Sequence, residues 1–215
     1  MRRALILALL LSSAFAAAQL YEHRWTRTDN SHPAYGQMVR AWGDACYSAY
    51  VDGKSVQIVK YLLSGDQAWK KEVTPTNSNT SFLRGMAVTA HGVYIAVSAQ
   101  ASSLNGKSLL IGYDHNGNAL PASEFSQSGN SSPTDLAADS AGSLYLLGYT
   151  YTGSANQGDI FVQKFDYLLR RHWFKNFKPE TTAQFSYNIR PADSGSSVYF
   201  TQGMQLKISL GTFSS

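Results

Sequence analysis

A tyrosine recurs along the chain at nearly regular spacing and limits what the chain can fold into. Tyr47, Tyr94, Tyr145 and Tyr199 are separated by 47, 51 and 54 residues. Each lies in the second of several short segments rich in aromatic and β-branched residues, which favour strands. A period in this range is typical of repeat architectures, in which one unit buries its apolar face only against the next. The chain is therefore expected to form a row of stacked, multi-stranded units.

The clearest unit covers residues 134–177. Its second and third segments are rich in Tyr, Leu, Thr and Phe, and the third carries apolar residues on both parities, so it is expected to be covered on both sides. Between the first two segments, residues 139–143 contain Asp, Ser and Gly, which favour a turn. The expected strands are Asp135–Ala138, Leu144–Thr152, Asp159–Asp166 and His172–Phe177. Four strands per unit, stacked face to face, predict an all-β fold, a small β-propeller of four-stranded antiparallel blades.

This unit resembles the bacterial β-propeller repeats known as SBBP repeats. It reads DLAADSAGSLYLLGYT, then GDIFVQKFD, then a strand centred on Trp. The other copies in the chain are degenerate. The resemblance implies a propeller and an extracytoplasmic protein, and it implies no common reaction, so no catalytic residue is carried over. The positions that match the family pattern are Asp135, Ala137, Asp139, Gly142, Tyr145, Gly148, Thr150, Asp159, Phe161, Lys164 and Asp166.

Residues 1–18 have the features of a secretory signal. Arg2 and Arg3 precede an apolar core, Ala4–Phe15, and small residues stand before Gln19. The apolar core is shorter than the roughly 20 residues that a membrane span needs. We therefore expect cleavage before Gln19, a secreted, periplasmic or cell-surface protein, and no integral membrane span. Without the two arginines the formal net charge falls from +4 to +2, too little to indicate nucleic acid or an anionic membrane as a partner.

Residues 19–215 are expected to form one propeller domain. A strand at residues 20–28, centred on Trp25, has no unit of its own, whereas the last unit contains only three expected strands. We expect the N-terminal strand to complete the last blade and to close a ring of four blades, because pairing removes two exposed sheet edges. A fifth, irregular blade or a ring completed by a second chain are alternatives. The repeats cover about residues 37–75, 85–127, 134–178 and 187–215.

Polar residues recur at the turns between the expected first and second strands. They are Asp44, His91, Asp139 and Asp193. Because equivalent turns lie at one mouth of a ring, these residues are candidates for a ligand-binding site that takes a cation or a sugar. Turn-forming Asp beside Gly or Ser explains the same residues without any ligand.

No pattern in the chain indicates a metal or another cofactor. The five histidines lack the paired spacing of a zinc site, and neither a phosphate-binding glycine loop nor a nucleophile elbow occurs. Residues 114–118, DHNGN, lack the closing acidic residue of a calcium loop and predict a hairpin turn. The single cysteine, Cys46, is expected to be a buried, unreactive thiol. Trp25, Trp69 and Trp173 stand among basic residues and are expected to pack between blades, with stacking on bases or sugars as the alternative.

Two functions of different class fit these observations. The first is a non-catalytic propeller that binds a protein or a glycan in the cell envelope, and it rests on the expected fold and signal. The second is an extracytoplasmic hydrolase or lyase whose polar residues converge at the mouth of the channel. The chain is expected to act without a cofactor, as a monomer.

Overall fold

A computed structural model gives the fold as a set of antiparallel sheets. It describes residues 35–102, 105–121, 123–125, 130–151, 158–177, 187–192, 197–202 and 204–209. These residues contain strands and turns and no helix, which confirms the all-β class. The first two sheets contain β1 (Tyr35–Trp42), β2 (Ala45–Asp52), β3 (Ser55–Leu62) and β4 (Gln67–Val73), then β5 (Thr80–Thr89), β6 (Gly92–Ser102), β7 (Asn105–Tyr113) and β8 (Ser123–Phe125). The third and fourth contain β9 (Asn130–Ala138), β10 (Leu144–Tyr151), β11 (Gly158–Phe165) and β12 (Arg171–Phe177), then β13 (Tyr187–Pro191), β14 (Ser197–Gln202) and β15 (Met204–Ser209).

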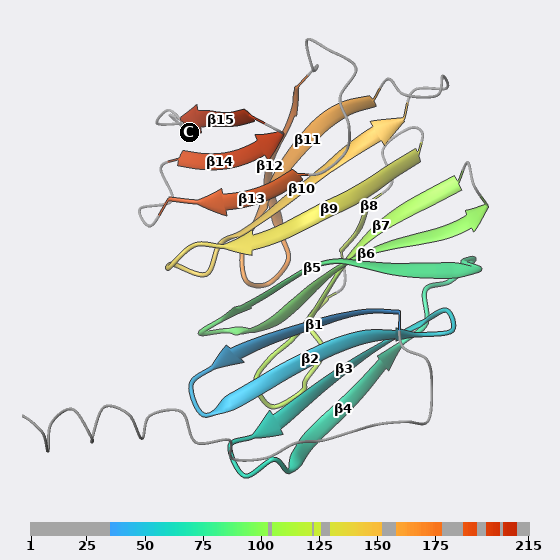
Figure 1. Ribbon diagram of the computed structural model, residues 1–215, viewed down its shortest axis with the longest axis vertical. Helices are drawn as coiled ribbons and strands as arrows, with labels where there is room; N and C mark the ends of the chain where they lie inside the picture. Colours follow the sequence, from blue (N-terminus) through green and yellow to red (C-terminus); the bar gives the residue numbers. More distant parts are fainter. Residues whose placement is uncertain are drawn as a thin grey trace, which may run out of the picture.

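Each sheet is a meander in which consecutive strands pair antiparallel. The four sheets follow one another along the long axis of the molecule, and the first strands β1, β5, β9 and β13 lie against each other in that order (Figure 1). We call these four the inner strands. The first and last sheets lie at opposite ends of the view, so the described sheets form an open stack rather than a closed ring. The strand expected at residues 20–28 lies outside the described residues.

Three apolar clusters hold the sheets together, one at each junction. The first joins alternate residues of β2, such as Tyr47 and Ala49, to Ile95 and Val97 of β6. The second joins β6 to β10 and β11, and the third joins β10 and β11 to Ile189 of β13. The second and third sheets are therefore covered on both faces, which explains why apolar residues fill both parities of their central strands.

Buried tyrosines on the second strands anchor these junctions. Tyr47, Tyr94 and Tyr145 are all nearly inaccessible to solvent. The Tyr47 hydroxyl bonds His115 Nδ1 at 2.6 Å, and the Tyr94 hydroxyl donates to the carbonyl oxygen of Tyr167 at 2.9 Å. Both partners belong to the turn between the third and fourth strands of the following sheet. Each of these two tyrosines thus packs its ring in a junction and forms a hydrogen bond across it with its hydroxyl. A buried Tyr hydroxyl usually needs such a partner.

An aspartate on β9 joins the third sheet to the fourth. Asp135 accepts a hydrogen bond from its neighbour Leu136 N through Oδ1 (2.8 Å) and from Ile189 N of β13 through Oδ2 (2.9 Å). Arg190 Nη1 lies 3.3 Å from the same Oδ2. The equivalent position in the second sheet is Gly85, where an added Cβ would lie 2.3 Å from Leu136 N. Neighbouring inner strands therefore meet either by direct backbone contact or through this carboxylate.

Replacing Asp135 with Ala is expected to destabilise the protein. The change leaves the Ile189 amide without its charged acceptor, and hydrogen bonds to charged groups contribute about 1.5–3 kcal/mol each. Urea denaturation followed by tryptophan fluorescence should show a lower midpoint. Asp135→Asn, which keeps one carbonyl acceptor, should fall between wild type and Asp135→Ala. Equal midpoints for all three proteins would show that the carboxylate does not hold the sheets together.

Candidate functional site

The described turns that carry the expected rim residues lie along one side of the stack, on the left in Figure 1. Asp44 lies between β1 and β2, His91 between β5 and β6, and Asp139 between β9 and β10, whereas Asp193 is outside the described residues. The His91 ring approaches the turn of Asp139 closely, because an added Cβ on Gly142 would lie 2.8 Å from His91 Cδ2. Asp44 is exposed, and no hydrogen bond or ion pair joins it to another described residue. The structure thus brings together His91 and the Asp139 turn but not Asp44.

The carboxylate of Asp139 organises its own turn. Oδ1 accepts hydrogen bonds from Ala141 N (3.0 Å) and Ser143 N (2.8 Å), and Oδ2 accepts one from the Tyr145 hydroxyl (3.0 Å). Burial, followed by the hydrogen bond to Asp139, raises the pKa of Tyr145. With both oxygens engaged, this carboxylate is a structural group of the kind that the turn-forming interpretation predicts.

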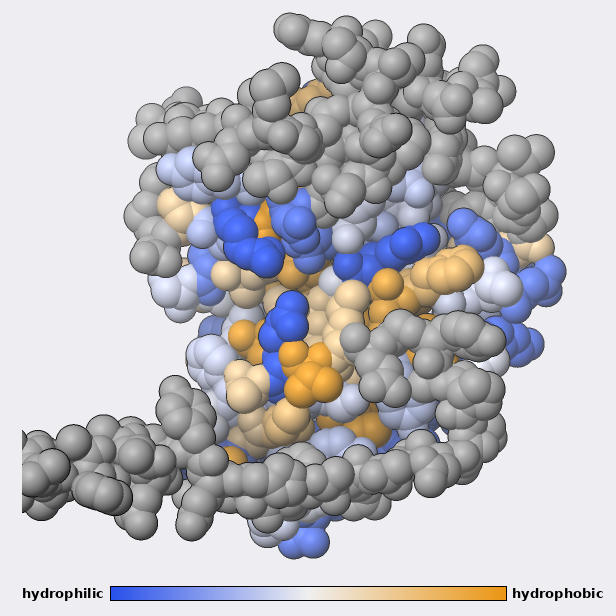
Figure 2. Space-filling model, in the orientation of Figure 1, coloured by the Kyte–Doolittle hydropathy of each residue, from blue (hydrophilic) through white to orange (hydrophobic). Residues whose placement is uncertain are grey.

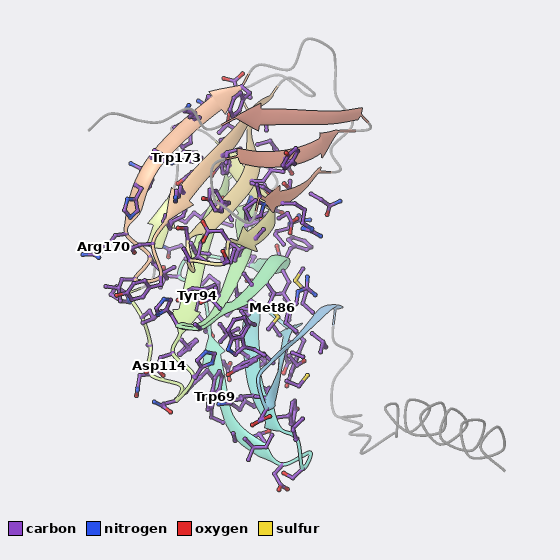
Figure 3. All side chains as sticks on the ribbon, turned by 90° about the vertical axis from the view of Figure 1, so that its left-hand side faces the viewer. Trp69, Met86, Tyr94, Asp114, Arg170 and Trp173 are labelled. Carbon is purple, nitrogen blue, oxygen red and sulfur yellow. The ribbon has the colours of Figure 1, made fainter. Side chains whose placement is uncertain are left out.

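The same turn design recurs at two other connections. Asp114 Oδ1 accepts from Asn116 N and Asn118 N, and Asp166 Oδ1 accepts from Leu168 N and Arg170 N. Residues 114–118 thus form a hairpin turn, as their sequence predicts. These bonds also lower the pKa of Asp114, led by the side-chain amide of Asn118. Figure 3 shows Asp114 and Arg170, from these two turns, on the same side of the molecule, with Trp69 and Tyr94 nearer the middle of the view.

The fourth residue of each such turn has a positive φ. Gly142 and Gly117 adopt it without strain, with φ of 83° and 85°, but Leu169 holds φ of 61°. This conformation is unfavourable for a residue with a Cβ. Leu169 is buried in the second junction, and the burial of its side chain offsets the strain.

His115 connects the first and second sheets. Its Nδ1 bonds the Tyr47 hydroxyl, and its Nε2 lies 2.9 Å from the carbonyl oxygen of Thr89. Its own carbonyl oxygen accepts from Lys60 Nζ (2.9 Å) and Trp69 Nε1 (3.2 Å). Both ring nitrogens are therefore used by the fold, and neither is free to act as a base or a metal ligand. No spacing in the sequence indicates this role of His115, because its partners lie on other strands.

His91 and Tyr167 form an exposed aromatic pair at the second junction. Their rings stack with centroids 4.0 Å apart and planes 19° from parallel. The His91 amide donates to Thr89 Oγ1 at 3.1 Å, and 40% of Tyr167 is accessible. The pair presents an aromatic surface beside the Asp139 turn rather than a catalytic dyad.

Two of the tryptophans pack between sheets as expected. In the first junction, the centroid of the Trp69 ring lies 6.0 Å from that of Tyr47 and 6.1 Å from that of Tyr113. In the third junction, the ring centroids of Trp173 and Tyr145 are 6.3 Å apart. Trp25 lies outside the described residues.

Cys46 differs from the expectation in its exposure. It is half-buried on β2 rather than fully buried, because it lies on the face of the first sheet opposite Tyr47 and the first junction. Burial still raises the pKa of its thiol, which disfavours the reactive thiolate. Among the described residues, no three His, Cys, Asp or Glu side chains are grouped so that they could hold a metal ion. That part of the chain also contains no helix that is long and apolar enough to cross a membrane.

A second polar surface, which the sequence reasoning missed, follows the inner strands. It contains Arg40 on β1, Arg84 on β5 and Arg190 on β13, together with the half-exposed ring of Phe82. We call it the inner-strand face. Figure 2 shows strongly hydrophilic groups interspersed with hydrophobic ones over the middle of the molecule in the view that presents the inner strands. A signal was present: each inner strand carries one charged residue in an otherwise uncharged segment.

Two of the solved structures that match the chain are distant oxygenase structures. An ACO/RPE65 chimera matches with a TM-score of 0.39 and 8% identity, over 77% of this chain and 46% of its own. A mutant of Synechocystis apocarotenoid oxygenase matches with a TM-score of 0.38 and 10% identity, over the same shares. The match covers 46% of the length of each of these two structures, so the chain spans less than half of either. At such TM-scores neither a fold nor an activity transfers to it. No family model and no curated protein matches the sequence.

Replacing Asp139 with Ala is expected to lower the free energy of unfolding by about 2 kcal/mol, because the turn loses its acceptor and the buried Tyr145 hydroxyl loses a partner. Asp44→Ala, at the exposed equivalent turn, is the matched control and should stay within about 0.5 kcal/mol of wild type. Equilibrium urea denaturation measures both. If the two variants had the same stability, the structural role of Asp139 would be wrong.

Proposed function

We propose that this protein is an exported, non-catalytic β-propeller that binds a protein or a glycan in the cell envelope. The observation that carries the proposal is that polar side chains in the turns between strands already form hydrogen bonds within the fold. Both carboxylate oxygens of Asp139 and both ring nitrogens of His115 are engaged in bonds that hold turns and sheets. The inner-strand face, by contrast, leaves charged and aromatic groups accessible. Polar groups that are engaged in the turns and accessible on the inner-strand face favour a binding surface over a reaction centre.

Export is supported by the charged and apolar pattern of residues 1–18. The resemblance of residues 134–177 to SBBP repeats supports the same compartment and a bacterial source. Asp135, Asp139 and Lys164 of the matching pattern all have structural roles: the first two are described above, and Lys164 Nζ lies 5.3 Å from the centroid of the Tyr145 ring. The pattern therefore describes a way of stacking sheets and leaves the ligand undefined.

We further propose that the stack closes into a four-bladed ring in the mature protein. The first three sheets each have four strands, whereas the fourth has three, β13, β14 and β15. A strand from residues 20–28, paired beside β15, would complete the fourth sheet and bring both chain ends into it. Pairing of this kind removes exposed strand edges. A fifth blade or a second chain are the competing ways to complete the ring.

Removing residues 19–28 from the mature protein is expected to cause aggregation or failure to fold, because the last sheet would keep an open edge. Trp25→Ala alone should lower the melting temperature strongly, since truncating a buried Trp costs about 3–5 kcal/mol. Calorimetry and light scattering measure the two effects. A monomeric deletion variant with an unchanged melting transition would rule out this strand as the closing element, and the four-blade ring with it.

The binding function is tested with the purified mature chain and washed bacterial cell envelopes. We expect saturable binding that either protease or periodate treatment of the envelopes abolishes, which identifies a protein or a glycan partner respectively. Mass spectrometry of the exported protein should show a chain that begins at or near Gln19. Because the proposal places binding on the inner-strand face, Asp44→Asn combined with His91→Gln at the rim should leave binding unchanged.

The alternative, a hydrolase or lyase, predicts a different result. Turnover of an envelope polymer that disappears in the Asp44→Asn, His91→Gln protein would establish catalysis at the rim. Retention of the protein in the cytoplasm with Met1 intact would contradict export.

A further inference from the structure

The charged residues of the inner strands are unbalanced. β1, β5 and β13 each contribute one arginine, Arg40, Arg84 and Arg190, and β9 contributes one aspartate, Asp135. The four strands lie against each other in sequence order (Figure 1), and Arg190 lies beside Asp135 of the neighbouring strand. Three arginines against one aspartate leave the inner strands with an excess of positive charge, although the chain as a whole is only slightly basic.

The single carboxylate is already in use. Asp135 accepts from the backbone amides of Leu136 and Ile189 and lies 3.3 Å from Arg190 Nη1. Arg40 donates through Nη1 to the carbonyl oxygen of Val39 (2.9 Å) and meets no carboxylate among the described residues. Arg84 likewise has no acidic partner in the described part of the chain. Within the described part of the chain, these two guanidinium groups therefore have no carboxylate partner.

Arg84 is held in an arrangement suited to a planar anion. Its guanidinium lies 5.1 Å from the centroid of the Phe82 ring, and that ring is 42% exposed. The Nε atom is buried and has no hydrogen-bond partner among the described atoms. Contact with the ring limits the positions that the guanidinium can take, and its two Nη groups remain as donors for a carboxylate, which Arg binds in a bidentate manner.

Recognition of a peptide backbone is disfavoured on this face. The edges of β5 and β9 touch where Gly85 meets Leu136, so no strand can insert between them at that point. Further along, Asp135 occupies the amides of Leu136 and Ile189. Strand addition requires free edge amides and carbonyls. The groups left for recognition are guanidinium forks and the face of an aromatic ring.

We propose that the inner-strand face binds an acidic polysaccharide, with sugar carboxylates held by Arg40 and Arg84 and a sugar ring against Phe82. This inference rests on the proposed binding function and names its ligand class. Uronate residues combine a carboxylate with an apolar ring face, which matches the pairing of Arg84 with Phe82. Arg190 adds positive charge to the site while it also contacts Asp135.

Calorimetric titration of the mature protein with polygalacturonate tests the proposal. We expect binding that weakens as salt is raised, because exposed charges are screened. Fully methyl-esterified polygalacturonate, which has the same backbone without free carboxylates, should not bind. Arg40→Gln and Arg84→Gln should each weaken binding about tenfold, equivalent to about 1.4 kcal/mol. Arg84→Lys should recover only part of the loss, since it keeps the charge but not the fork.

Arg171→Gln is the matched control, because Arg171 is an exposed arginine on the outer strand β12 and lies away from the inner strands. Its affinity should equal that of wild type. Circular dichroism and melting curves establish that each variant is folded. Should Arg84→Gln fail to fold, Arg40→Gln carries the test, because Arg40 is exposed.

Four results would overturn the proposal: no binding of polygalacturonate, equal binding of the methyl ester, equal binding of polyglutamate, or equal weakening by Arg171→Gln. Failure of the proposed function would look different. Cleavage of the polymer would show an enzyme rather than a binding module, even with arginine-dependent binding. Saturable binding to envelopes without binding to polygalacturonate would show that the ligand is not an acidic polysaccharide, while the proposed binding function would stand.

Discussion

The rings of Tyr47, Tyr94 and Tyr145 occupy successive junctions, where one sheet covers the apolar face of the next. A four-stranded sheet that stands alone leaves its apolar face in water, which is unfavourable. Each large side chain buried at a junction contributes about 1.5–3 kcal/mol. The stack is thus stable only as a series, in which each sheet completes the core of its neighbour.

The turns belong to the same cores. His115 lies in a turn of the second sheet yet bonds Tyr47 of the first, and the turn of Tyr167 caps Tyr94 in the same way. A loop anchored so firmly loses the mobility that many binding loops need. In this fold these turns therefore hold one sheet to the next, and Asp side chains determine the conformation of the turns.

Much of the fold could be predicted from the sequence, because strand class and turn chemistry depend on local residue choice. The antiparallel all-β class, the hairpin turn at residues 114–118 and the packing of Trp69 and Trp173 were all predicted and are confirmed. Ring closure is an association of distant segments, and the described sheets remain open. The roles of His115 and Asp135 were missed for a related reason: each depends on a partner on another sheet.

The candidate site illustrates why turn position alone is a weak guide to function. A polar group at a sheet junction must satisfy its hydrogen bonds there, because an unpaired buried polar atom costs about 1–3 kcal/mol. Asp139 and His115 meet this demand within the fold, with both carboxylate oxygens and both ring nitrogens engaged. The inner strands are the first strands of their sheets, and some of their side chains, such as Arg40 and Phe82, are exposed and not required for packing in the same way. Arg40 and Arg84, which have no carboxylate partner among the described residues, are the groups that the proposed ligand engages.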